Sequence, residues 1–152
     1  MIMGFERQRA RLAASAQRHG EDAFPAFVRG RTDDQLLRTI GRPAKQRMIF
    51  KGMERNFQPH KAIGFVGDIQ YVLTGGDAER PWVVRIDGDI STGPGRSADP
   101  TVTLQMSAPT LARLVTRDLP PAQAFMEGRI EIDGDLQVAA RMGEWFGQAT
   151  PF

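Results

Sequence analysis

The 152-residue sequence contains no cysteine and no long apolar run. The absence of cysteine excludes disulfides, thiol nucleophiles and zinc–thiolate sites. No apolar run approaches the roughly 20 residues that a membrane-spanning helix needs. The chain turns polar by residue 6, so we expect no signal peptide, and it ends in GQATPF, which is not a peroxisomal or endoplasmic-reticulum address. These absences together favour a cytoplasmic protein.

Motifs that carry chemistry are also scarce. Neither His19 nor His60 has an acidic or histidine neighbour at the spacing of metal ligands. No serine lies in the G-x-S-x-G pattern of a hydrolase nucleophile, and neither a phosphate loop nor a dinucleotide fingerprint is present. We therefore expect no enzyme activity, no metal site and no cofactor.

The acidic tetrapeptide IDGD occurs twice, at 86–89 and at 132–135, and has two interpretations. Its carboxylates could bind a metal, but a hard cation needs roughly six to eight oxygen ligands, and both copies continue into apolar sequence. Alternatively, the first copy makes a hairpin turn, while Gly134 turns the second strand into a helix that Asp135 caps. These backbone roles already explain each residue, so we favour them.

Charge is unevenly distributed along the chain. Residues 1–61 carry 13 Lys and Arg against 6 Asp and Glu, whereas residues 62–152 carry 7 against 12. A basic N-terminal helix could contact a membrane surface, a partner protein or the acidic part of a second copy in a homodimer. A solvated helix face explains the same pattern without any partner. Nucleic acid is disfavoured, because aromatic residues are not interleaved with the N-terminal arginines.

Hydrophobic periodicity changes along the chain and predicts both helices and strands. Apolar residues recur at helical spacing before Pro59 and with a period of two after it. Thr32 and Ser107 are expected to cap helices, and Pro43 suits a first helical position. The predicted helices cover 2–18, 33–40, 43–57, 107–119, 120–128 and 135–146. The predicted strands cover 62–74, 81–89, 101–106 and 129–132, and residues 91–100 are expected to form a loop.

This order of elements indicates an α+β fold, with helices on one face of a mostly antiparallel sheet. In the first strand, alternation places Asp68 and Gln70 on the face away from the core. The expected core face of that strand carries Ile63, Phe65, Ile69, Tyr71 and Leu73.

Apolar residues are abundant in the predicted helices, and the chain contains seven methionines, whose thioethers adapt to irregular apolar shapes. The last helix carries Met142, Trp145 and Phe146, and the preceding helix carries Phe125 and Met126. The pattern alone favours an ordinary hydrophobic core over a ligand cavity, because every domain needs such a core.

Residues 43–146 resemble the sterol carrier protein family, whose members contain an SCP-2-like sterol- and lipid-binding domain. The segment PWVVRIDG is similar to the family's tryptophan-led strand, and SADPTVTLQMS to its alanine–aspartate loop, strand and serine cap. The most recognisable block is LARLVTRDLPPAQAFMEGRIEIDGDLQVAARM, with two helices, a strand and the entry to a final helix. We accordingly expect an N-terminal helical extension at 1–30 and a sterol-carrier-protein-like domain at 31–152.

The resemblance implies about five strands and helices on one face, enclosing an apolar tunnel. Family members bind and sometimes transfer sterols, fatty acids, acyl-CoA or phospholipids without covalent chemistry. In bacteria, some carrier-like domains assist enzymes that act on very apolar substrates such as isoprenoid quinone precursors, so an accessory or scaffold subunit is the alternative. A tunnel suffices for affinity, because each methylene removed from water contributes about 0.8 kcal/mol. The expected lining or lid comprises Leu104, Met106, Leu114, Val115, Phe125, Met126, Leu136, Ala140, Met142, Trp145 and Phe146.

Overall fold

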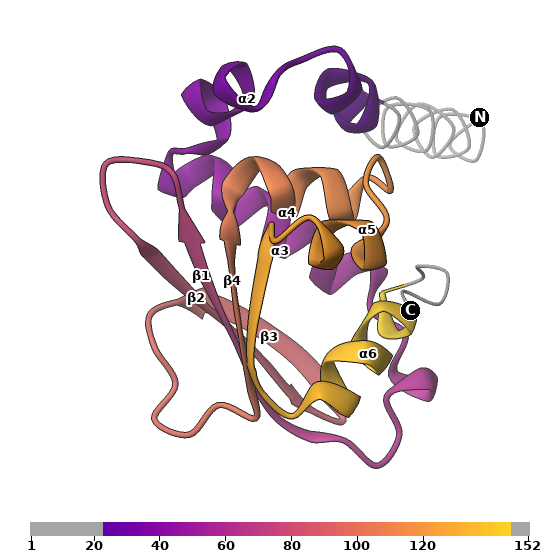
Figure 1. The fold of residues 1–152 in the computed structure, drawn as a ribbon. Helices are drawn as coiled ribbons and strands as arrows, with labels where there is room; N and C mark the ends of the chain where they lie inside the picture. Colours follow the sequence, from indigo (N-terminus) through magenta and orange to yellow (C-terminus); the bar gives the residue numbers. More distant parts are fainter. Residues whose placement is uncertain (1–22, 147–152) are drawn as a thin grey trace, which may run out of the picture.

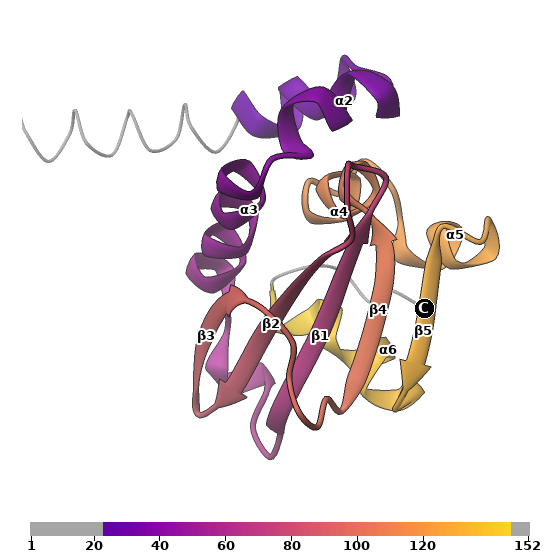
Figure 2. The same cartoon turned by 90° about the vertical axis from the view of Figure 1, so that its left-hand side faces the viewer.

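The computed structural model describes residues 23–146, which form a five-stranded sheet with helices against one face (Figure 1). The strand order is β3-β2-β1-β4-β5, in which only β1 and β4 pair in parallel. Figure 2 shows the sheet from the side that the helices leave uncovered. The prediction of an α+β fold with a mostly antiparallel sheet is therefore confirmed. The strands are β1 (Val66–Thr74), β2 (Arg80–Asp87), β3 (Asp89–Pro94), β4 (Val102–Ser107) and β5 (Ile130–Gly134).

Helices α3, α4 and α6 cover the inner face of the sheet, while residues 23–29 and α2 lie across one end of α3 and α4 (Figures 1 and 2). The helix predicted over 2–18 lies outside the described residues. Within residues 23–146, no helix is both long and apolar enough to span a bilayer. The helices are α2 (Asp33–Ile40), α3 (Pro43–Asn56), α4 (Ala108–Val115), α5 (Pro121–Met126) and α6 (Leu136–Trp145), with a 3₁₀ turn η1 (Pro59–Lys61).

Local side-chain chemistry sets the helix boundaries, as predicted. The Thr32 hydroxyl accepts a hydrogen bond from the Gln35 amide, and the Gln35 side chain accepts one from the Thr32 amide, which completes a capping box. The Ser107 hydroxyl accepts a hydrogen bond from the amide of Thr110 at the start of α4. Pro43 begins α3, where its missing amide hydrogen costs nothing.

Both IDGD segments serve the backbone. Gly88 has φ +72° in the turn between β2 and β3. Gly134 has φ +111°, and a Cβ there would lie 2.6 Å from the carbonyl oxygen of Thr101, so only glycine fits. Asp135 caps α6 by accepting hydrogen bonds from the amides of Gln137 and Val138 at 3.0 and 3.1 Å. The hairpin and capping roles predicted for these residues are confirmed.

The edge strand β3 was predicted to be mostly loop, and that prediction was wrong. The residues after Ile90 lack alternating apolar side chains, so no periodic signal marks a strand. A tertiary contact supports it instead, because Glu54 of α3 accepts hydrogen bonds from the amide and hydroxyl of Thr92 at 2.8 and 3.0 Å. Partial burial of Glu54 opposes its ionisation, but hydrogen bonds from Lys51 and Thr92 outweigh that effect and lower the pKa of Glu54.

One prediction about the first strand was also wrong, and the position of Gln70 on the outer face was right. Ile63 is 78% exposed, because β1 begins only at Val66 and the turn before it carries Ile63 into solvent. Gln70 is 3% exposed, although it lies on the outer face of the sheet. The loop after β3 covers it: the Gln70 amide group donates to the carbonyl of Gly95 and accepts from the amide of Ser97.

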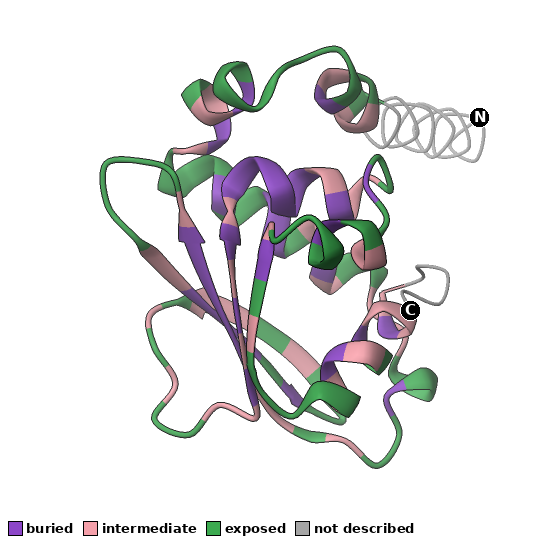
Figure 3. Ribbon diagram, viewed as in Figure 1, coloured by how far each residue is buried: buried purple, intermediate pink, exposed green. Residues whose placement is uncertain are grey.

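The core lies between the inner face of the sheet and α3, α4 and α6, and Figure 3 shows burial concentrated in the central strands and α4. Phe50 of α3 stacks on Trp82, with ring centroids 5.0 Å apart, and meets the edge of Tyr71 at 5.3 Å. The indole nitrogen of Trp82 donates to the Gln46 side chain at 2.9 Å. These contacts seat α3 on β1 and β2, beside the space that forms the candidate site.

Candidate functional site

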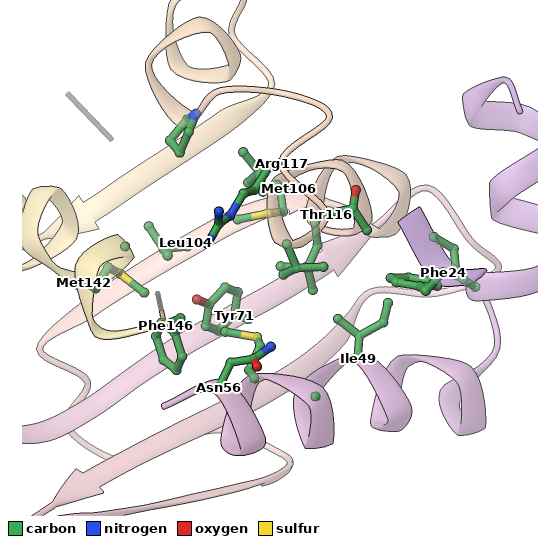
Figure 4. Close-up of a pocket in the computed structure, with 18 of the residues that line it drawn as sticks. Phe24, Ile49, Asn56, Tyr71, Leu104, Met106, Thr116, Arg117, Met142 and Phe146 are labelled. Carbon is green, nitrogen blue, oxygen red and sulfur yellow. The ribbon is translucent and has the colours of Figure 1, made fainter. Parts of the chain in front are cut away.

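A cavity of about 1250 Å³ lies between the sheet and the helices (Figure 4). Small-molecule sites commonly measure about 300–1,000 Å³, so this space is large enough for an extended ligand. Its walls come from the inner face of the sheet and from α3, α4 and α6, with residues 23–29 and α2 closing one end.

The sheet forms a flat apolar wall. Tyr71 of β1 is paired with Leu104 of β4, which is paired with Ile132 of β5, so these three side chains lie in one row across the sheet. Met106 and Ile130 form the next row, two residues further along each strand. Side chains two residues apart share a face, so both rows point into the cavity.

Helix α3 forms the facing wall through residues at helical spacing, including Ile49, Gly52, Met53 and Asn56. Gly52 lies in the interior of this helix, where glycine costs about 1 kcal/mol relative to alanine. Apart from its chain neighbours and the backbone of α3, a Cβ at Gly52 would have one group of the described residues within 4 Å, the Arg55 side chain at 3.6 Å. The missing side chain therefore leaves open volume in the middle of the α3 wall.

Aromatic residues from 23–29 close one end of the cavity, where Phe24 and Phe27 join Ile40 of α2. We call residues 23–40 the roof. The guanidinium group of Arg113, on α4, holds the roof by donating to the carbonyl oxygen of Arg31 at 2.8 Å and to the carboxylate of Asp33 at 2.8 Å.

Two more hydrogen bonds from Arg113 reach the carbonyl oxygen of Val28 at 3.3 Å and the carboxylate of Asp118 at 2.9 Å. Burial disfavours the charge, but the hydrogen bonds and charges of Asp33 and Asp118 outweigh it and raise the pKa of Arg113. The guanidinium group thus stays ionised while it joins the roof to α4.

Among residues 23–146, the polar residues of the lining include cations but no carboxylate. Lys45 and Arg55 belong to α3, and Arg117 follows α4 in the left-handed conformation, with φ +62°. Figure 4 shows Arg117 extending towards the cavity near Met106. These three cations make the described lining positively charged, which favours a negatively charged group on the ligand. Besides Tyr71, the polar residues of the described lining are Thr39, Lys45, Arg55, Asn56, Gln58, Thr116 and Arg117.

The predicted lining residues fall into two groups. The cavity is lined by Leu104, Met106, Leu114, Val115, Met142 and Phe146. The residues that do not line it are Phe125, Met126, Leu136, Ala140 and Trp145. Met126 and Leu136 are 85% and 62% exposed, because they lie on outer turns of α5 and α6. Trp145 is 1% exposed and packs on Phe65, with ring centroids 4.8 Å apart.

Sequence patterns did not identify several of the residues that line the cavity. The α3 wall had a usable signal, since Ile49 and Met53 recur at helical spacing, but the same pattern describes an ordinary core helix. Tyr71 was assigned to the core face of its strand, and nothing in a period-two pattern separates a residue beside a cavity from one in solid packing. No helix was predicted for the stretch around Pro25 that contains Phe24 and Phe27, although residues 23–29 are helical in the structure.

Comparison with known proteins gives a family match. The model of the SCP-2 sterol transfer family matches residues 55–147, more than half of the chain. Hydroxysteroid dehydrogenase-like protein 2 of Xenopus laevis is 27% identical over 141 residues, which cover 90% of this chain and 32% of the relative. Sterol carrier protein 2 of Gallus gallus is 28% identical over 106 residues, or 64% of this chain and 19% of the relative. This chain therefore spans a third or less of the length of these relatives.

Solved structures share the fold. Palmitated SCP2L2 from Aedes aegypti superposes with a TM-score of 0.58 at 20% identity, covering 67% of this chain and 94% of that one. The sec-alkylsulfatase Pisa1 from Pseudomonas sp. superposes with a TM-score of 0.54 at 24% identity, covering 66% of this chain and 15% of that one. At these identities the likeness establishes the fold alone. The five strands and their covering helices are thus a shared architecture.

Proposed function

We propose that this chain, which belongs to the SCP-2 sterol transfer family, binds lipids in the cavity between its sheet and helices. It releases them without covalent chemistry. The observation that carries the proposal is the cavity of about 1250 Å³ walled by apolar side chains of the sheet and α3. Burying an acyl chain there contributes about 0.8 kcal/mol for each methylene removed from water. We infer that the ligand is a fatty acid, an acyl-CoA, a phospholipid or a sterol.

The charged part of the lining supports an orientation for an anionic lipid. Lys45 lies in the first turn of α3 and Arg55 in its last, and Arg117 follows α4. A carboxylate or phosphate beside one of these cations would keep its charge balanced while the tail occupies the apolar interior. In this orientation the apolar walls supply most of the affinity and the cations select the head group.

Delipidated protein is expected to bind palmitate with a dissociation constant in about the micromolar range, measurable by fluorescent-probe displacement. The double variant Lys45→Gln/Arg55→Gln should weaken palmitate binding by about threefold to tenfold, since each exposed ion pair is worth less than about 1 kcal/mol. Hexadecanol, which has the same tail but no charge, serves as the control ligand and should bind both proteins alike. If neither ligand binds and native mass spectrometry finds no lipid on freshly purified protein, the proposed function is wrong.

A second candidate is an accessory or scaffold module that presents apolar substrates, such as isoprenoid quinone precursors, to a partner enzyme. The supporting observation is that the chain spans only 32% of a dehydrogenase-like relative and 15% of a sulfatase structure. In this function the basic N-terminal part would dock on the partner or on a membrane surface. Alternatively, the basic N-terminal part would contact the acidic part of a second copy in a homodimer.

Deleting residues 1–22 separates the two functions. The predicted domain boundary after residue 30 is unsuitable for this purpose, because Phe24 and Phe27 line the cavity and Val28 is fully buried. A carrier should keep its palmitate affinity within about twofold after this deletion, since the cavity walls remain. An accessory module should lose its membrane or partner association, measured by vesicle sedimentation and by co-purification. Loss of palmitate binding without loss of folding would count against both.

A further inference from the structure

The Tyr71 hydroxyl is a polar group with no partner in an otherwise apolar wall. Tyr71 is 4% exposed and lines the cavity from the central strand β1. Among the described residues its hydroxyl forms no hydrogen bond. No fully enclosed side-chain nitrogen or oxygen in residues 23–146 lacks a partner, so the unpaired Tyr71 oxygen must be reached from the cavity.

The position of this hydroxyl is held by packing. The Tyr71 ring meets Phe50 edge to face, with centroids 5.3 Å apart and planes at 74°. Figure 4 shows the hydroxyl pointing across the cavity towards Leu104 and Met142. A rigid ring on a central strand presents its oxygen at one fixed place, which is the arrangement that gives a binding site specificity.

An unpaired hydroxyl in an apolar place is unfavourable, because it loses its hydrogen bonds with water and gains none. Burial raises the pKa of Tyr71 well above its usual value, so the phenol remains neutral and can both donate and accept a hydrogen bond. Phenylalanine would fill the same space at no such cost. The presence of tyrosine is therefore explained by something that enters the cavity and pairs with the oxygen.

We propose that the Tyr71 hydroxyl binds an uncharged oxygen group, a hydroxyl or a ketone, on the apolar body of the lipid. This inference rests on the proposed lipid-binding function and specifies its ligand class. The lining already offers the cations Lys45, Arg55 and Arg117 to a charged group of the ligand, so the neutral Tyr71 phenol is best matched to an uncharged oxygen. The ligand class is then an oxygenated lipid, such as a hydroxy fatty acid or a sterol.

Selectivity for the position of the oxygen is the decisive measurement. Stearate and a series of stearates hydroxylated at single positions along the chain are titrated against wild-type protein and against Tyr71→Phe. One positional isomer should bind wild-type protein at least about fivefold more tightly than the other isomers, and Tyr71→Phe should remove that preference while stearate changes by less than about twofold. If Tyr71→Phe lowers the affinity for all isomers equally, or lowers it for none, the inference is overturned.

A second pair of ligands distinguishes the two sources of the oxygen. Cholesterol and cholestane differ by one hydroxyl, so a preference for cholesterol that Tyr71→Phe abolishes would assign the site to sterols. A preference confined to one hydroxystearate would assign it to oxygenated fatty acids. If stearate binds wild-type protein but neither pair shows a Tyr71-dependent preference, the inference fails and the carrier function stands. If no ligand of either type binds, the proposed function itself fails.

Stability and spectroscopy separate this role from a structural one. Because the hydroxyl has no partner among the described residues, Tyr71→Phe should melt at the same temperature as wild-type protein or higher. A lower melting temperature would indicate that the hydroxyl supports the fold. Tyr71 is also the single tyrosine of the chain. Labelling with 3-fluorotyrosine therefore gives one ¹⁹F signal, which the preferred oxygenated ligand should shift further than stearate does; equal shifts would contradict direct pairing.

Discussion

Replacing Gly52 by leucine is expected to weaken lipid binding more than tenfold while making the protein more stable. Gly52 lies inside α3 and lines the cavity, and apart from its chain neighbours and the backbone of α3, the nearest described atom to a Cβ there belongs to the Arg55 side chain, at 3.6 Å. A leucine side chain would enter that volume and displace part of the lipid tail. Excluding only two methylenes costs about 1.6 kcal/mol of binding, which exceeds a factor of ten.

Stability should change in the opposite direction. Leucine is a strong helix former, so Gly52→Leu removes a penalty of about 1 kcal/mol, which raises the melting temperature by about 2–4 °C in a chain of this size. Palmitate titration and thermal melting measure the two effects on the same protein. Gly52→Ala is the matched control, because it brings the same gain in helix propensity but fills almost none of the cavity.

These two measurements distinguish a blocked cavity from a damaged fold. A variant that binds less because it is misfolded melts at a lower temperature, whereas Gly52→Leu should melt higher. Unchanged palmitate affinity in Gly52→Leu, with the expected rise in melting temperature, would show that the lipid does not occupy the space beside α3. That result would contradict the proposed site while leaving the fold intact.

The regular elements were predictable because local chemistry decides where they begin and end. Thr32, Ser107 and Asp135 each cap a helix with a side-chain oxygen, and such residues can be recognised without knowing the tertiary structure. Gly134 was predictable for the same reason, because a strand that turns at once into a helix requires a residue free to adopt positive φ. Element boundaries set by tertiary contacts could not be predicted in this way. Strand β3 depends on Glu54 of another element, and its own residues carry no signal for it.

The cavity was less predictable than the fold, because a hydrophobic pattern reports which face of an element is turned inward but not what it meets there. On α6, Met142 and Trp145 are both apolar and buried, yet only Met142 lines the cavity. Phe125 and Met126 looked like lining for the same reason, and they lie on the outer surface. No sequence pattern identifies the Tyr71 hydroxyl, because its importance depends on the lack of a hydrogen-bond partner among the described residues. Hollow space arises from the geometry of several elements together and has no local pattern.

The roof is attached to α4 by few polar contacts. Residues 23–40 contribute Phe24 and Phe27 to the cavity, but their polar attachment to α4 depends largely on one side chain, that of Arg113. If the lipid leaves the cavity at the end that the roof closes, it must pass the roof on its way out. The strength of the Arg113 contacts should then set the rate of lipid exchange as well as the stability of the protein.

Arg113→Ala is therefore expected to destabilise the protein and to accelerate lipid release. The substitution removes four hydrogen bonds from a side chain that is 13% exposed, and it leaves the carbonyl oxygens of Val28 and Arg31 without this donor. Because water can replace part of this bonding, we expect a loss of about 2–3 kcal/mol, or about 5–10 °C in melting temperature. Stopped-flow transfer of a fluorescent fatty acid to vesicles should show a rate constant several-fold higher than that of wild-type protein.

Two further variants show whether the geometry of the guanidinium group is responsible. Arg113→Lys keeps the charge, but an ammonium group cannot donate to all the acceptors that the planar guanidinium group reaches. It should therefore recover less than half of the stability that Arg113→Ala loses. Arg129→Ala removes contacts with Asp33 and Thr110 but none with the backbone of the roof, so it should cost less than about 1 kcal/mol and leave the transfer rate unchanged. If Arg113→Ala loses stability but releases lipid at the wild-type rate, the roof does not lie on the exit path. Lipid would then leave beside α6, where the Gln58 amide donates to the carbonyl of Trp145 at 2.7 Å and Phe146 lines the cavity.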